Sequence, residues 1–162
     1  MDDGKLVELS AVGVTPQFIA DLSARGYAPA SLDDLTEFAA LGVSPGYIDA
    51  LASAGYRNIG ADKITQLKAV GVNPTMIATL AAAGYRNLSV DDLEQMAALN
   101  ITPGFIQSFA RIGYVNLPVD QLVELKALDV TPEFVLNANR NGFGPVSPKK
   151  AAELNAIGDD RN

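Results

Sequence analysis

One phrase recurs along the chain at a fixed spacing of 29 residues. It first appears as GVTPQFIADLSARGY from Gly13, and the later copies begin at Gly42, Gly71, Asn100 and Asp129. A fixed period in this range is typical of a stacked repeat array, because each repeat is one supersecondary element that cannot bury its apolar face alone. The proline of the phrase marks each copy without insertion: Pro16, Pro45, Pro74, Pro103 and Pro132.

Each period carries the signals of two short helices. Helix A is seen in SLDDLTEFAALG, where Ser31 is a suitable N-cap, Asp34 follows three residues later, and apolar residues recur at helical spacing. Helix B begins inside the recurring phrase, where an N-cap residue precedes a proline at the first helical position. It ends at a glycine suited to the left-handed cap, followed by an aromatic residue. The predicted N-caps of helix B are Thr15, Ser44, Asn73, Thr102 and Thr131.

These signals predict an all-α protein, a right-handed α-solenoid of short helical hairpins with six A helices and five B helices. The first A helix is expected from about Asp2. We predict one domain over residues 1–158. Its repeats are expected at about 2–30, 31–59, 60–88, 89–117 and 118–146, with a C-terminal capping helix at 147–158 and a tail at 159–162.

One register of helix A holds alanine in every repeat. We interpret this column as a close approach between neighbouring helices, which would leave no room for a larger side chain. Its members are Ala11, Ala40, Ala69, Ala98, Ala127 and Ala156.

Composition argues against catalysis. The chain has no cysteine and no histidine, which removes thiolate nucleophiles, the commonest general base and the commonest transition-metal ligands.

One column of acidic residues recurs in the repeats. It falls in the first turn of successive A helices, where carboxylates favour the positive end of the helix dipole. No segment resembles a calcium loop. We expect no enzyme, no cofactor and no metal. The acidic column is Asp33, Asp62, Asp91 and Asp120.

Charge and hydropathy limit the partners. A net charge of -7 disfavours nucleic acid, because binding to phosphates draws on clustered cations. No apolar run approaches the roughly 20 residues that span a bilayer, and the acidic start MDDGKLVELS is unlike a signal peptide. We therefore expect a soluble chain without membrane insertion. The sequence does not assign its compartment, which would be the periplasm or the cytoplasm if the chain is an excised domain.

Four cations are the candidate partner-binding residues. Arg57 and Arg86 lie one period apart in the turns GYRNIG and GYRNLS, where they could bind an acidic partner or remain solvated turn residues. Lys68 and Lys126 occupy a variable, solvent-facing register of helix A.

The aromatic residues that follow the recurring glycine have two interpretations, a ligand-stacking ladder or helix-terminating packing, and we favour packing. This aromatic column is Tyr27, Tyr56, Tyr85, Tyr114 and Phe143.

The pattern L-x-x-L-x-A-x-G-V-T-P-x-F-I-x-x-L-x-x-x-G-Y, from about Leu6 to Gly158, resembles a repeat of several bacterial proteins. These include the soluble C-terminal parts of membrane metallopeptidases of the beta-lactam-sensor type. The resemblance implies an extramembrane repeat domain used for sensing or protein contact. It does not imply peptidase activity, because the chain has no H-E-x-x-H motif and no membrane segment.

The hairpins also resemble the helix-hairpin-helix modules of recombination and repair proteins, whose hairpin reads G-V-G-P. Gly42, Val43 and Pro45 match that pattern, while Ser44 replaces the second glycine. In that family, backbone N–H groups of the hairpin hold a DNA phosphate with help from a nearby lysine or arginine. The segments GVSPGYID and GVNPTMIA contain no cation, so we expect the geometry without the DNA chemistry.

The function we predict is a non-enzymatic module that binds a protein or peptide partner, as a scaffold or sensor domain. Two alternatives remain. One is a tandem helix-hairpin-helix-like protein that binds nucleic acid, and the other is a purely structural or engineered array.

Overall fold

A computed structural model describes residues 10–27 and 32–159. Within these ranges every regular element is helical and no strand is present, which confirms the all-α class. The start of the predicted first A helix, over residues 2–9, and the predicted N-cap Ser31 lie outside the described residues. The chain divides into two compact units, unit 1 (Met1–Ala78) and unit 2 (Thr79–Asn162).

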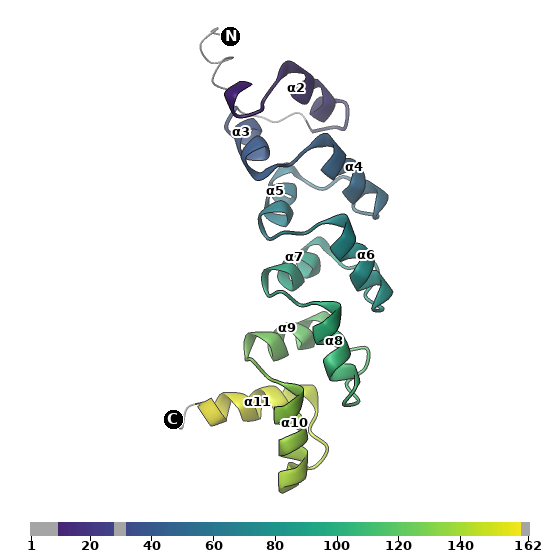
Figure 1. Ribbon diagram of the computed structural model, residues 1–162, viewed down its shortest axis with the longest axis vertical. Helices are drawn as coiled ribbons and strands as arrows, with labels where there is room; N and C mark the ends of the chain where they lie inside the picture. The colour runs from purple at the N-terminus through teal and green to yellow at the C-terminus, as the bar shows by residue number, and fades with distance from the viewer. Residues whose placement is uncertain (1–9, 28–31, 160–162) are drawn as a thin grey trace. The chain divides into compact units, whose positions relative to one another are not determined.

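Unit 1 alternates the two kinds of helix. Helix α2 packs against α4, and α3 packs against α5, so B helices contact B helices and A helices contact A helices (Figure 1). The boundary of the unit falls within α6 (Pro74–Ala82). The helices of unit 1 are α2 (Pro16–Ser23), α3 (Leu32–Leu41), α4 (Pro45–Ser53) and α5 (Ala61–Ala69).

Unit 2 follows the same alternation. Helix α7 packs against α9, and α9 packs against α11. A short π-helical turn, Asn139–Phe143, follows α10, and α11 continues to the first residue of the predicted tail. The helices of unit 2 are α7 (Val90–Ala98), α8 (Pro103–Ala110), α9 (Val119–Ala127), α10 (Pro132–Ala138) and α11 (Pro148–Asp159).

The B helices begin where the sequence predicts. The Phe18 N–H donates to the Thr15 hydroxyl oxygen at 3.1 Å, and the Tyr47 N–H donates to that of Ser44 at 3.1 Å. These side chains satisfy N–H groups that lack a partner within the helix, and proline follows each cap. The remaining predicted caps, all confirmed by the same bond, are Asn73, Thr102 and Thr131.

The helices also end as predicted. Gly55 has a φ of 101°, and the Tyr56 N–H donates to the Leu51 carbonyl at 2.9 Å, which is the bond of a Schellman cap. Asn100 and Asp129 take the same left-handed conformation at the ends of α7 and α9, where earlier copies have glycine. Short polar side chains tolerate this conformation better than other non-glycine residues.

The core consists of the apolar stripes of both helix types. Phe38 and Leu67 of the A helices are buried in unit 1, as are Met96 and Leu125 in unit 2. Burial of one such side chain contributes roughly 1.5–3 kcal/mol.

The alanine column is not a close-packed contact, so that interpretation is wrong. The structure exposes Ala40, Ala69 and the other four alanines of the register. The physical reason is helical phase: at about 100° per residue, Ala69 lies on the opposite side of α5 from buried Leu67. Alanine at an exposed helix position needs no packing explanation, because it has the best helix propensity.

Candidate functional site

A pocket of about 260 Å³ opens on unit 1. It lies where the turn after α2, helix α4, and the turn between α4 and α5 come together. Its floor is buried and apolar, and consists of Ile48, Leu51, Ile59 and Ile64. Its rim is polar, and consists of Arg25, Tyr27, Asp49, Tyr56, Arg57 and Asn58. An apolar cavity edged by a few polar groups is the usual form of a binding site.

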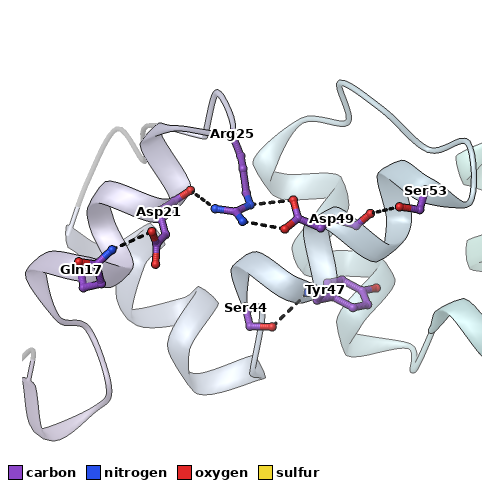
Figure 2. Close-up of polar contacts among 7 residues, drawn as sticks. All are labelled: Gln17, Asp21, Arg25, Ser44, Tyr47, Asp49 and Ser53. Carbon is purple, nitrogen blue, oxygen red and sulfur yellow. Dashed lines mark hydrogen bonds and ion pairs between the residues drawn. The ribbon is translucent and has the colours of Figure 1, made fainter.

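An ion pair spans two repeats at the rim. Arg25, in the turn after α2, donates from Nε and Nη2 to the two carboxylate oxygens of Asp49 on α4, both at 2.7 Å (Figure 2). Its third nitrogen, Nη1, donates to the Asp21 carbonyl at 2.7 Å. The hydrogen bond between the side chains raises the pKa of Arg25 and lowers the pKa of Asp49. The two-pronged geometry fixes the guanidinium in place.

Arg57, one of the predicted partner-binding residues, lies on the same rim. Its side chain is exposed, and its Nε donates to the Ala52 carbonyl at 3.2 Å. In the part of the chain that the structure describes, Arg57 forms no ion pair. Because Asp49 balances Arg25, Arg57 leaves the pocket lining with one net positive charge.

The tyrosines of the rim belong to the aromatic column. Burial raises the pKa of Tyr27, and a backbone hydrogen bond with Ile59 opposes that rise. In unit 2 the Tyr85 hydroxyl donates to the Leu117 carbonyl at 2.8 Å, and the Tyr114 hydroxyl donates to the carbonyl of Val146. Each bond reaches a residue 32 positions later: Leu117 lies just before α9, and Val146 lies just before α11. These bonds occupy the hydroxyls of Tyr85 and Tyr114 within the protein, which favours packing over a ligand-stacking ladder for these two residues.

Lys68 and Lys126 lie elsewhere and are less free than predicted. The Lys68 ammonium is 4.6 Å from the ring centre of Tyr47, and that of Lys126 is 5.2 Å from the ring centre of Phe105. Both lysines are half-buried. A cation over an aromatic face is stabilised by about 0.5–1 kcal/mol at an exposed site. The prediction of a simple solvent-facing register was therefore wrong for these two residues.

Arg86 is exposed in the turn before α7. It belongs to unit 2, whereas Arg57 belongs to unit 1, so the two arginines are not part of one described site.

The acidic column takes the predicted helix-end positions. Asp33, Asp62, Asp91 and Asp120 lie in the first turns of α3, α5, α7 and α9, and all four are exposed. Among residues 10–27 and 32–159, no group of three or more potential ligands could hold a metal ion.

Sequence reasoning missed Arg25 and Asp49. The signal that could have found them is a break in the repeat: two complementary charges occur in adjacent copies, at registers that carry no charge elsewhere. The register of Arg25 otherwise holds Ala54, Ala83, Ile112 and Asn141, and that of Asp49 holds Ala20, Ala78, Gln107 and Leu136.

Unit 2 has a second cavity, of about 670 Å³, beside α11. Leu128, Phe134 and Asn155 contribute to its lining, and Asn155 Nδ2 donates to the Leu128 carbonyl at 2.6 Å. No cation lines it. The pocket of unit 1 therefore offers a ligand more kinds of contact, because its lining combines charged, polar and apolar side chains.

Comparison of the chain with known protein families, curated proteins and solved structures finds no match. Within the described residues, no helix has both the length and the apolar character needed to cross a bilayer.

Proposed function

We propose that the chain is a non-enzymatic helical-repeat module that binds a protein or peptide partner. The observation that carries this proposal is the pocket of unit 1, where a buried apolar floor meets a polar rim with one uncompensated cation. Such a site offers hydrophobic area for affinity and directed hydrogen bonds for orientation.

The proposal includes an α-solenoid with a 29-residue period. Helices α2 and α4 begin 29 residues apart, at Pro16 and Pro45, with the same cap. In unit 1 both kinds of helix pack against their own kind, and in unit 2 the A helices α7, α9 and α11 do so. Stacked helical hairpins expose extended surfaces, which repeat proteins use for binding.

The chemistry of the rim favours recognition over catalysis. Asp49 is held ionised by Arg25, which lowers its pKa and makes it a weak base. Burial raises the pKa of Tyr27, which makes its hydroxyl a weak acid near neutral pH. Neither group is set to exchange a proton with a substrate at pH 7.

Selection of peptides against the full chain tests the proposal. The library should contain random peptides with free and internal ends, and binding should be compared in two variants with the same chemical change. Ala52→Leu adds a side chain to the lining of the pocket, whereas Ala69→Leu adds it at an exposed site on α5. We expect Ala52→Leu to weaken the binding of the selected peptides at least tenfold and Ala69→Leu to leave their binding unchanged. Failure to select any peptide, or equal binding to both variants, would contradict this use of the pocket.

One contact favours a second candidate, the binding of nucleic acid by the hairpins. The Lys68 Cε lies 3.8 Å from the position that a Cβ would take on Gly42. A cation therefore approaches the GVSP hairpin from the next A helix, although the hairpin segment itself has none. Titration of a DNA duplex at two salt concentrations separates the candidates. Micromolar binding that weakens steeply with salt and is lost in Lys68→Gln would favour nucleic acid over a peptide partner.

A further inference from the structure

The pocket of unit 1 joins one positive charge to an apolar surface. Arg57 is the uncompensated cation of its lining, and the exposed Asn58 beside it adds a side-chain amide. The same lining includes Ile59, with 8% of its surface exposed, and Leu51, with 1%. A ligand that complements this lining carries one negative charge close to an aliphatic group. The chain as a whole has a charge of -7, so the positive lining is a local departure.

The ion pair of Arg25 determines which arginine is free to bind. All three side-chain nitrogens of Arg25 already donate hydrogen bonds, two to the Asp49 carboxylate and one to the Asp21 carbonyl. Among the described residues, Arg57 uses only Nε, for a 3.2 Å bond to the Ala52 carbonyl. Its two terminal nitrogens can therefore form the paired hydrogen bonds that a carboxylate accepts.

The size of the pocket favours a peptide C-terminus over an internal Asp or Glu as the source of the carboxylate. Its volume of about 260 Å³ is below the roughly 300–1,000 Å³ of sites that hold drug-sized ligands. An internal Asp or Glu would need a second residue to fill the floor, and neighbouring Cα atoms are about 3.8 Å apart. At a peptide C-terminus, the carboxylate and the side chain are attached to the same Cα. One residue then supplies both groups.

We infer that the pocket binds the C-terminal residue of a peptide, with its free carboxylate on Arg57 and an aliphatic side chain on the floor of Ile48, Leu51, Ile59 and Ile64. This inference rests on the proposed function, because it names the ligand of the same pocket.

The test uses the isotope-labelled full chain and three short peptides. The probes are acetyl-Ala-Ser-Leu with a free carboxylate, the same peptide with an amidated end, and amidated acetyl-Leu-Asp-Ala, which carries its charge internally. NMR titration follows the methyl groups of Leu51 and Ile59 and the Nε–H of Arg57. We expect the free acid to shift these signals and to bind about tenfold more tightly than either amide, as suits a hydrogen-bonded charge.

Matched variants test whether Arg57 causes the preference for the free acid over the amide. Arg57→Gln should remove the tenfold preference for the free acid, and Arg57→Lys should retain part of it, because lysine keeps the charge without the planar fork. Arg86→Gln is the control, since Arg86 occupies the same register of the next repeat and should leave the preference unchanged.

The outcomes separate the inference from the proposed function. Equal binding of free acid and amide at the Leu51 and Ile59 methyls would overturn the carboxylate inference while the peptide-binding proposal stands. Equal binding of the internal Asp peptide would overturn the assignment to a C-terminus. If none of the three probes shifts the pocket at millimolar concentration, the inference also fails, and the peptide selection above decides the proposed function by itself.

Discussion

The hydroxyl of Tyr47 donates a buried hydrogen bond of 2.9 Å to the carbonyl oxygen of Val72. Tyr47 lies on α4, and Val72 lies three residues beyond the end of α5. The bond therefore ties a B helix to the turn that follows the next A helix. Lys68 covers the same ring from α5, so two contacts between neighbouring repeats meet at one tyrosine.

Tyr47→Phe should lower the free energy of unfolding by about 1 kcal/mol. The change removes the hydroxyl and leaves the buried carbonyl of Val72 without this donor, while the ring beneath Lys68 remains. Urea unfolding followed by circular dichroism measures the difference. An unchanged unfolding midpoint would show that water replaces the donor at no cost.

Stability should also fall at alkaline pH. Burial raises the pKa of Tyr47 to about 12, above its value of about 10 in an unfolded chain. The folded state thus retains the phenol proton longer, so this contribution is complete below about pH 10 and is lost between about pH 10 and 12. Urea unfolding at about pH 9 and pH 11 measures the loss. Tyr47→Phe should lose less than the wild type over this interval, and parallel curves for the two proteins would contradict the assignment to Tyr47.

The pair of Arg25 and Asp49 should appear in an acid titration. The hydrogen bond to Arg25 lowers the pKa of Asp49, so its stabilising effect is present above the unfolded value of about 3.9 and is lost as the pH falls through the lower folded value. In Arg25→Gln we expect the Asp49 carboxyl carbon to titrate at a higher pH by NMR. High salt should reduce the difference in the pKa of Asp49 between the wild type and Arg25→Gln, because the ion pair is accessible to solvent. Identical titration curves would count against the pair in solution.

Two glycines of α4 and its cap should respond in opposite directions to alanine. Gly55 has a φ of 101° with open space around a new Cβ, so Gly55→Ala strains only the backbone and should destabilise the chain by about 1–3 kcal/mol. Gly46 is helical, and a Cβ there would make only ordinary contact with the Ser44 hydroxyl at 3.8 Å. Gly46→Ala should stabilise by about 0.4–1 kcal/mol. Thermal unfolding of the two variants measures both effects, and a Gly55→Ala variant as stable as the wild type would refute the cap assignment.

The local signals of the sequence predicted much of this fold. N-caps such as Thr15 and Ser44 act through residues three positions away, so a single copy of the repeat contains the whole interaction. The candidate site was harder to predict, because its contacts join residues more than 20 positions apart. Arg25 reaches Asp49 through the packing of successive helices, and outside the site Lys68 reaches Tyr47 in the same way. Only the packed structure places Arg57 beside that ion pair.

The alanine register of helix A provides the last prediction. Its lack of variation among the repeats suggested a tight contact, but Ala69 is exposed on the side of α5 opposite buried Leu67. Leucine is nearly as good a helix former as alanine, and no core contact is displaced at this site. Ala69→Leu should therefore change the free energy of unfolding by less than about 0.5 kcal/mol, the usual range for a surface substitution. Leu67→Ala is the matched control, because it empties a buried site on the same helix and should cost about 2–5 kcal/mol. A loss of more than about 1 kcal/mol in Ala69→Leu, measured by urea unfolding, would restore the close-approach interpretation.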